Sequence, residues 1–268
     1  MKTEKIKVHY TDNDLIQATN PVTVNLIGAG GTGSKVLTAL TELNHSLTEL
    51  NHAGLNVRLW DDDIVTHANL GRQRFAECEV GLHKSVALIN RANRCTGTNW
   101  KAETVKFQRD SKGRLPEHAQ ATIYLSCVDN VSARFEIAEI LKKTPYSYNR
   151  TGSPTYWMDF GNGKRSGQVV LSTVGEVKQP RSEKYETVAI LPFITDEFGE
   201  LLRESEATDD TPSCSVADAL AKQDLYINSA VATLGCDLLW RLFRYGMTRY
   251  RGFFLNLEDF RTQPITVA

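Results

Sequence analysis

The sequence lacks the features of several classes of protein. No apolar run approaches the roughly 20 residues that a membrane helix needs, and residues 1–10 are polar and basic. The 5 cysteines are scattered, without a C-x-x-C pair or a cysteine–histidine cluster, so we expect reduced thiols and no zinc site. A net charge of -1 gives no broad positive field for nucleic acid. These absences predict a cytoplasmic protein without membrane or nucleic-acid partners.

The composition is typical of a globular chain with a substantial core, because 41% of the residues are hydrophobic and 24% are charged. The apolar, β-branched stretch at 22–27 predicts a strand, and a glycine-rich turn and an amphipathic helix follow it. Leu40, Leu43, Leu47 and Leu50 form one stripe of that helix. We interpret the stripe as core packing, with a partner-binding seam as the alternative.

The first half of the chain alternates between strand and helix patterns. Further strands are predicted at 56–60, 100–107 and 121–127, and helices at 81–94 and 132–141. This alternation is typical of a parallel sheet that binds ligands at the carboxyl ends of its strands. The second half predicts a hairpin, a long helix and a closing strand, at 156–174, 225–245 and 251–257.

We therefore predict an α/β fold: a Rossmann-like, mostly parallel sheet flanked by helices, with antiparallel strands added in the C-terminal half. Residues 183–212 are acidic and interrupted by proline and glycine, which predicts a mobile loop. We expect one domain, 1–268, with a nucleotide-binding half at 1–145 and a sheet-completing, partner-binding half at 146–268.

The pattern G-x-G-x-x-G at residues 28–33 lies between a predicted strand and a predicted helix. Such a turn lets backbone N–H groups approach phosphates, and the start of the helix adds a partial positive charge. The pattern alone is also compatible with an NAD-dependent oxidoreductase, in which an acidic residue such as Asp61 would hold the ribose of the dinucleotide.

The segment after Asp61 favours a different nucleotide. Arg72 and Lys84 provide two cations suited to a triphosphate, and Asp129 follows a predicted strand as a hard oxygen ligand for Mg²⁺. A dinucleotide site has no use for this combination. The residues therefore predict a nucleoside triphosphate bound with magnesium.

A series of motifs in the same order resembles the ThiF, MoeB and ubiquitin-activating-enzyme superfamily. Residues 28–33 are similar to its G-x-G-G-x-G, 61–73 to its D-x-D-x-V-x-x-x-N-L-x-R-Q, 81–84 to its G-x-x-K, and 129–130 to its D-N. Within the superfamily, residues 212–218 and 222–225 resemble the ThiF-family proteins of the plasmid-associated PRTRC system.

The resemblance implies an adenylyltransferase that uses ATP and Mg²⁺. Its substrate would be the C-terminal carboxylate of a small ubiquitin-like, β-grasp carrier protein, activated as an acyl-adenylate with release of pyrophosphate. It also implies a homodimer. Arg72, Lys84 and Asp129 would be catalytic, and Asp129 would hold Mg²⁺. The residues that the resemblance implies at the nucleotide are Gly28, Gly30, Gly31, Gly33, Asp61, Asn69, Arg72, Gln73, Lys84 and Asp129.

The sequence departs from the family in ways that leave alternatives open. No arginine precedes Arg58, so the family's N-terminal arginine that reaches the neighbouring subunit's ATP is missing. The candidate substitutes are Lys2, Lys5, Lys7 and Arg74, and loss of this contact between subunits is the alternative. Cys214 precedes a predicted helix and is either a nucleophile with a lowered pKa or an inert thiol. A non-catalytic ATP-binding partner subunit is the alternative function.

Overall fold

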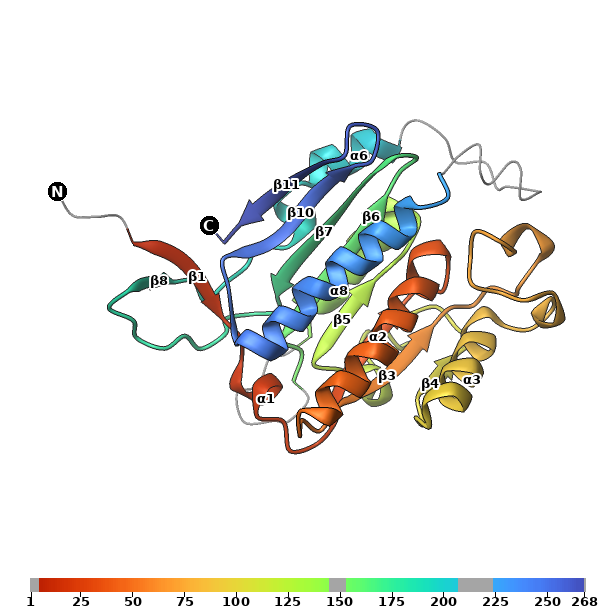
Figure 1. The fold of residues 1–268 in the computed structure, drawn as a ribbon, viewed down its shortest axis with the longest axis horizontal. Coiled ribbons are helices and arrows are strands. Elements are labelled where there is room, and N and C mark those ends of the chain that lie inside the picture. Colours follow the sequence, from red (N-terminus) through yellow and green to blue (C-terminus); the bar gives the residue numbers. More distant parts are fainter. Residues whose placement is uncertain (1–4, 145–152, 207–223, 268) are drawn as a thin grey trace.

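The computed structural model describes residues 5–144, 153–206 and 224–267. Its centre is an 8-stranded sheet with the order β11-β10-β7-β6-β5-β2-β3-β4 (Figure 1). The parallel part consists of β2 (Val22–Ile27), β3 (Leu55–Trp60), β4 (Lys101–Glu103), β5 (Ile123–Ser126) and β6 (Tyr156–Asn162). The antiparallel part consists of β7 (Ser166–Thr173), β10 (Tyr250–Asn256) and β11 (Arg261–Thr266). The predicted α/β fold, with antiparallel strands in the C-terminal half, is confirmed.

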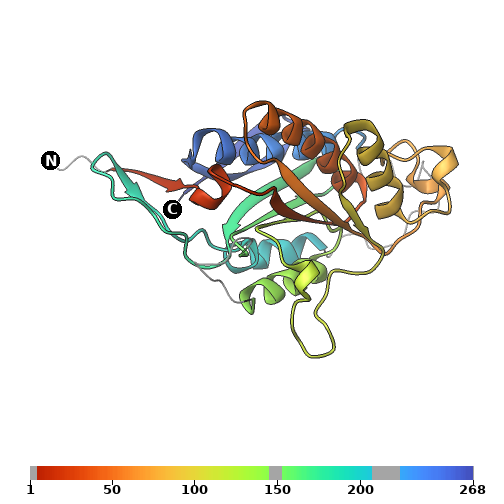
Figure 2. The same cartoon turned by 90° about the horizontal axis from the view of Figure 1, so that it is seen from below.

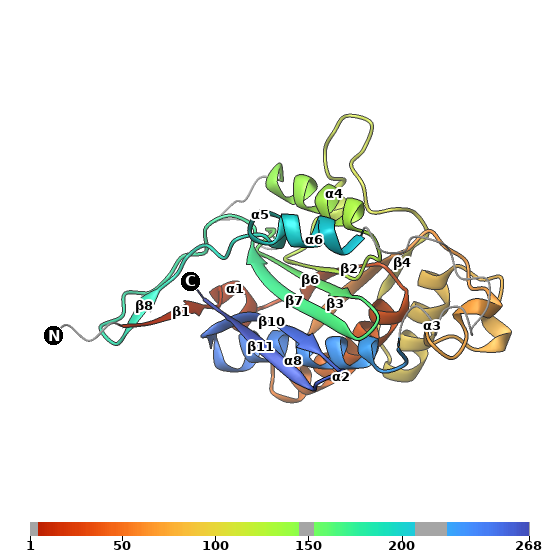
Figure 3. The same cartoon turned by 90° about the horizontal axis from the view of Figure 1, so that it is seen from above.

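Helices cover both faces of the sheet (Figure 3). One face carries α2 (Gly31–Glu49), α3 (Lys84–Thr96) and α8 (Ile227–Tyr245), and the other carries α4 (Val131–Lys142), α5 (Ile194–Glu197) and α6 (Gly199–Glu206). The central strands are apolar on both sides because both faces are covered. Two buried apolar clusters result, one on each face of the sheet.

The leucine stripe of α2 packs against the sheet and α8 over most of its length. Leu40, Leu43 and Leu47 are buried in the cluster that also contains Val231 of α8, which confirms the interpretation as core packing for these three. Leu50 follows the helix and is 51% exposed. In the described part of the chain, no helix combines the length and apolarity needed to cross a membrane.

Two predicted elements have different limits in the structure. The strand predicted at 100–107 ends at Glu103, because its neighbour β3 ends at Trp60, the residue that pairs with Glu103. The helix predicted at 81–94 begins at Lys84, because Gly81 has a φ of 91° and His83 forms a bridge with Ile64. These changes place Lys84 at the first position of α3.

The segment 183–212, predicted as a mobile loop, contains regular secondary structure in its described part. The segment contains a strand, β8 (Tyr185–Thr187), and the helices α5 and α6; residues 207–212 lie outside the described parts. Phe193, Ile194 and Leu202 are buried against the sheet, and their apolar contacts hold the segment in place despite its acidic surface.

A second, 3-stranded sheet has the order β8-β1-β9. It joins β1 (Ile6–Tyr10), which the sequence analysis did not predict, to β8 and to β9 (Met247–Thr248). β1 and β8 extend away from the main body as an arm (Figures 1 and 2). The remaining short elements are α1 (Asn13–Ile16) and the 3₁₀ turns η1 (His67–Asn69), η2 (Glu77–Glu79) and η3 (Glu117–Ala119).

Candidate functional site

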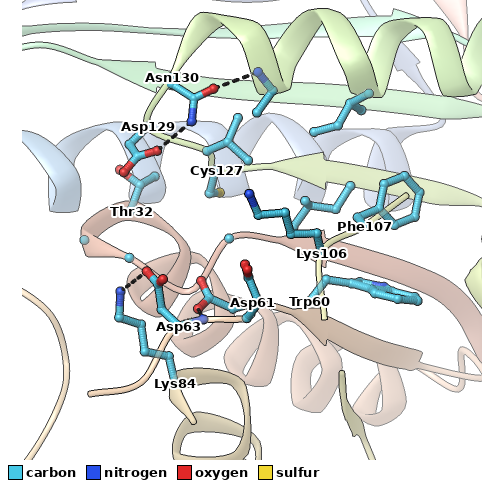
Figure 4. Close-up of a pocket in the computed structure, with 18 of the residues that line it drawn as sticks. Thr32, Trp60, Asp61, Asp63, Lys84, Lys106, Phe107, Cys127, Asp129 and Asn130 are labelled. Carbon is cyan, nitrogen blue, oxygen red and sulfur yellow. Dashed lines mark hydrogen bonds and ion pairs between the residues drawn. The ribbon is translucent and has the colours of Figure 1, made fainter. Parts of the chain in front are cut away.

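A cavity of about 690 Å³ lies at the carboxyl ends of the parallel strands (Figure 4). It brings together most of the site residues predicted from the sequence, although they come from separate segments of the chain. Those in its lining are Gly28, Gly30, Gly31, Asp61, Arg72, Gln73, Lys84 and Asp129. Gly33 and Asn69 are not among the lining residues.

The glycines of the turn at 28–33 have different structural roles. Gly28 has a φ of +97°, and a Cβ there would lie 2.7 Å from the carbonyl oxygen of Cys127. A Cβ at Gly30 would meet nothing within 4 Å, so this position leaves open space at the cavity. A Cβ at Gly33 would lie 1.9 Å from the carbonyl oxygen of Gly28. Gly33 therefore allows α2 to pack on the turn and does not face the ligand space.

Asp61, directly after β3, binds the glycine turn. Its Oδ2 accepts a hydrogen bond of 2.6 Å from the Ala29 amide, and its Oδ1 accepts one of 3.0 Å from the Asp63 amide. Burial raises the pKa of Asp61, while the Ala29 hydrogen bond and the Lys84 charge act against that rise. The carboxylate thus fixes the turn and still lines the cavity.

Lys84 is buried at the start of α3, and its Nζ lies 2.7 Å from Oδ2 of the exposed Asp63. The Lys84 amide also donates to the Asp63 carbonyl oxygen at 3.0 Å. These two contacts connect the loop after β3 to α3. Figure 4 shows the side chains of Lys84 and Asp63 directed toward each other, and both residues line the cavity.

Arg72 and Asp129 occupy another part of the cavity lining. Burial lowers the pKa of Arg72, and the nearby Asp129 carboxylate opposes that shift. Asp129 follows β5, and its Oδ1 accepts a hydrogen bond of 3.2 Å from the side chain of Asn130. Asn130 in turn accepts a hydrogen bond of 2.7 Å from the Ala133 amide and so caps α4. The cap orients the segment that carries Asp129.

Gln73 and Asn69 lie in different environments although they are close in sequence. Gln73 is buried in the lining, and its Oε1 has no hydrogen-bond partner among the described residues. A buried acceptor of this kind is suited to a ligand that donates a hydrogen bond. Asn69 instead accepts hydrogen bonds from the amide and the hydroxyl of Thr66, at 2.9 and 3.1 Å. Its side chain therefore stabilises η1.

A buried ion pair supports the segment that carries Asp129. The sequence analysis did not predict this pair. Arg134 Nε lies 3.1 Å from Asp159 Oδ2, and both residues are buried. Arg134 also donates to the carbonyl oxygen of Val128 at 2.9 Å, and Ser126 donates to Asp159 at 2.6 Å. The sequence carried a signal for Asp159, the one charged residue of 156–162, but none for Arg134, because 131–142 contains several other charged residues.

The sequence analysis also missed the two ends of the cavity. One end has apolar and aromatic walls, with Lys106 pointing into the space between them and the glycine turn (Figure 4). Its walls include Ile27, Trp60, Phe107 and Ile137. The other end holds hydrogen-bonded neutral side chains: Thr32 Oγ1 lies 2.8 Å from Asn228 Oδ1 and 3.0 Å from Asn162 Oδ1. These residues are separated by long stretches of sequence, so no local pattern connects them.

The acidic groups fit magnesium only when other ligands complete the site. In the parts of the chain that the structure describes, no group of three or more histidine, cysteine, aspartate or glutamate side chains could hold a metal ion. Asp129 offers one carboxylate, which suits an ion that takes its remaining ligands from phosphate and water. Asp129 could therefore hold Mg²⁺ together with a bound nucleotide.

Two of the described cysteines lie in surroundings that make their thiols unreactive. Cys127 and Cys236 are buried. Burial raises the pKa of the Cys127 thiol, and it raises the pKa of Cys236 to about 12. Both are therefore protonated thiols near neutral pH. Cys214, the candidate nucleophile, lies outside the described residues.

Solved structures with a similar fold share little sequence with this chain. A structure of PaaA has 16% identity and a TM-score of 0.58, and the match covers 95% of this chain and 65% of that chain. MccB of E. coli has 14% identity and a TM-score of 0.59, and the match covers 94% of this chain and 63% of that chain. The chain thus spans just under two-thirds of the length of these proteins.

A structure of E. coli MccB with ATP has 14% identity and a TM-score of 0.55, with 94% of this chain and 65% of that chain covered. No curated protein matches the sequence. The ThiF family matches residues 3–266, which is almost the whole chain. The chain belongs to the ThiF family.

Proposed function

We propose that this protein is an ATP-dependent adenylyltransferase that transfers AMP to a carboxylate and releases pyrophosphate. The observation that supports the proposal is the presence of Arg72, Lys84 and Asp129 in the lining of one cavity beside the glycine turn. They come from three separate segments, so their arrangement around a single space is not a product of local sequence. The ThiF family and the fold shared with MccB agree with this activity.

In the proposed reaction, a carboxylate oxygen of the acceptor attacks the α-phosphorus of ATP. A bond forms between these two atoms, and the bond from the α-phosphorus to the oxygen that bridges to the β-phosphate breaks. Negative charge grows on pyrophosphate, and Arg72 and Lys84 stabilise it as fixed cations. A carboxylate is already ionised near neutral pH, so the reaction needs no general base.

The lining of the cavity offers groups suited to each part of ATP. The amides of Gly30 and Gly31 would face the phosphates, and the apolar end near Trp60 and Phe107 would take the base. Asp61 would bond the ribose. Asp129 would hold Mg²⁺, which supplies neutralisation of the phosphate charge when it is bound. Gln73 would use its buried Oε1 to accept from a ribose hydroxyl or a metal-bound water.

We further propose that the acceptor is the C-terminal carboxylate of a small ubiquitin-like, β-grasp carrier protein. The motif resemblance to activators of such carriers supports this choice. Structures of MccB, a microcin C7 biosynthetic enzyme, include complexes with ATP and with N-formylated MccA. A homodimer, a cytoplasmic location and a place in a PRTRC system belong to the same proposal. Most of the PRTRC-like residues, at 212–223, lie outside the described parts.

The test is carrier-dependent exchange of pyrophosphate into ATP, measured with candidate carriers that end in a free carboxylate. We expect Arg72→Ala and Asp129→Ala to reduce exchange by about 100-fold or more, the scale of losing one group that stabilises the transition state. Arg241→Ala and Asp237→Ala are matched controls, because both residues are exposed on α8 and pair only with each other in the described contacts. These controls should retain exchange.

Two results would contradict the proposal in different ways. Retained exchange in Arg72→Ala and Asp129→Ala would refute the assignment of the site. Binding of MgATP without exchange, for any carrier tested, would favour the alternative function of a non-catalytic ATP-binding partner subunit.

A further inference from the structure

Lys35 connects two segments of the candidate site that are distant in sequence. It is the fifth residue of α2 and is half-buried. Its Nζ donates a hydrogen bond of 2.8 Å to the carbonyl oxygen of Arg72 and one of 3.4 Å to the carbonyl oxygen of Gly31. One ammonium group therefore joins the glycine turn to the backbone of the arginine that lines the cavity.

Other contacts hold the same arginine segment on both sides. The Arg74 amide donates to Ser34 Oγ of α2 at 3.4 Å, and Arg91 of α3 donates to the Arg74 carbonyl oxygen at 2.7 Å. The backbone at 72–74 is thus held between α2 and α3. Of these contacts, those of Lys35 include one to Arg72 itself.

The surroundings of Lys35 disfavour its charged form when no anion is bound. The charged groups that shift its titration are Arg74 and Arg72, both cations on the same neighbouring segment, and the start of α2 adds further positive potential. Burial, then Arg74, then Arg72 lower the pKa of Lys35 to about 8. Positive groups held together against their repulsion are typical of a site that binds a polyanion.

We propose that Lys35 is a positioning residue for the nucleotide: by binding the carbonyl oxygens of Gly31 and Arg72, it fixes the Arg72 side chain relative to the phosphate-binding turn. The proposal deepens the proposed function and rests on it for the identity of the ligand. Lys35 is not in the cavity lining, so it acts through Arg72 and not by touching the nucleotide.

A direct consequence is a coupling between nucleotide binding and the charge of Lys35. A bound triphosphate favours the protonated lysine, because its negative charge opposes the repulsion from the two arginines. By linkage, the protonated enzyme binds the nucleotide more tightly than the deprotonated enzyme. The affinity for ATP should therefore fall as pH rises through the range in which Lys35 loses its proton.

The experiment compares wild type with Lys35→Met, Lys35→Arg, Arg72→Ala and the double variant Lys35→Met/Arg72→Ala. The affinity for ATP is measured by calorimetry, and the kcat and KM of pyrophosphate exchange are measured with the carrier. We expect Lys35→Met to weaken ATP binding by about tenfold, the scale of one hydrogen bond to a charged group. The KM for the carrier should not change, and Lys35→Arg should restore most of the affinity because arginine can reach both carbonyls.

Two measurements distinguish a role of Lys35 in positioning Arg72 from a general effect of the substitution on the fold. The double variant should bind ATP as weakly as Arg72→Ala alone, because Lys35 acts through Arg72. Wild type should lose affinity between about pH 7 and about pH 9, and Lys35→Met should lack this part of the profile. Lys35→Gln is a second neutral variant should Lys35→Met fail to fold.

Additive losses in the double variant, or the same pH profile in wild type and Lys35→Met, would overturn the inference. A failure of this inference can also be distinguished from a failure of the proposed function. Without carrier-dependent exchange, the coupling of Lys35 and Arg72 in ATP binding can still be measured and would stand. With exchange present and additive losses, the proposed function would stand and the role of Lys35 would not.

Discussion

At the scale of single residues, identical amino acids in one motif have different tasks. Gly30 leaves open space at the cavity, whereas Gly33 allows α2 to approach the turn. The motif alone does not separate these roles, because both glycines occupy expected positions of G-x-G-G-x-G. The structure separates them, since it shows what an added Cβ would touch.

The first prediction uses this difference. Gly33→Ala should lower the free energy of unfolding by about 1–3 kcal/mol, because its Cβ would collide with backbone that cannot move freely. Gly30→Ala is the matched variant. It should leave stability nearly unchanged, because its Cβ would lie in open space, and weaken ATP binding by entering the phosphate region. Chemical denaturation and calorimetry measure the two quantities. Equal destabilisation by both substitutions would contradict the assignment.

Several residues predicted from the sequence line the cavity, but the contacts that support them were not predicted. Arg72, Lys84 and Asp129 were recognisable because charged groups stood at fixed intervals after predicted strands. Lys35 gave no such signal, since a lysine on a helix is ordinarily a solvated charge. Its role depends on a carbonyl oxygen 37 residues away. Only the fold brings these atoms together.

At the scale of elements, one buried histidine adds side-chain contacts to the strand pairing that attaches β1. His9 is buried, and its Nδ1 lies 2.7 Å from the Val188 carbonyl oxygen. Because a carbonyl oxygen can only accept, Nδ1 carries the proton and Nε2 accepts from the Tyr156 hydroxyl at 2.9 Å. The neutral ring thus connects β1 to the segment after β8 and to β6.

The second prediction concerns the response of β1 to acid. Burial lowers the pKa of His9 below its ordinary value of 6.5, and the hydrogen bond to Val188 opposes that shift. The contribution of His9 to stability is therefore complete above pH 6.5 and is lost as pH falls toward the lowered folded-state pKa. Hydrogen exchange of the β1 amides, corrected for the intrinsic rate, should show weaker protection at about pH 5.5 than at about pH 7.5.

A substitution that removes the titration should remove this acid response. His9→Gln should make the protection of β1 independent of pH over the same range, although lower throughout. His45→Gln is the matched control, because His45 is exposed on α2. The same acid response in wild type and His9→Gln would show that another group controls β1.

Elements that are set by local sequence were predicted well, and elements that depend on distant partners were not. The limits of β2 and α8 followed from apolar periodicity. β1 was missed because its partners, β8 and β9, lie far along the chain. The acidic segment was predicted as a loop because charge dominates its composition, although a few buried apolar side chains hold α5 and α6 in place.

At the scale of the whole molecule, the cavity collects residues from both halves of the chain. Asn162 and Asn228 come from the sheet-completing half, and they contact Thr32 at the start of α2. A ligand bound in this cavity would therefore contact segments that are distant in sequence. We expect it to stabilise the folded chain as a unit.

The third prediction is that MgATP raises the free energy of unfolding. Ligand binding to the native state alone adds about 2.7 kcal/mol when its concentration is about 100 times the dissociation constant. Thermal unfolding with MgATP, with ATP and a chelator, and with NADH should show stabilisation that depends on magnesium. Asp129→Asn should reduce the magnesium dependence, because it removes the carboxylate that would hold the ion. Stabilisation by NADH but not by MgATP would instead favour the dinucleotide alternative.

The sequence by itself determined the order of strands and helices in the parallel part and the positions of the charged motifs. These properties are local, because they depend on apolar periodicity, glycine conformation and spacing along the chain. The tertiary structure decided which glycine faces the cavity, which carbonyls Lys35 binds and how the acidic segment packs. These properties depend on atoms that are distant in sequence, and only the packing of helices on both faces of the sheet brings such atoms within bonding distance.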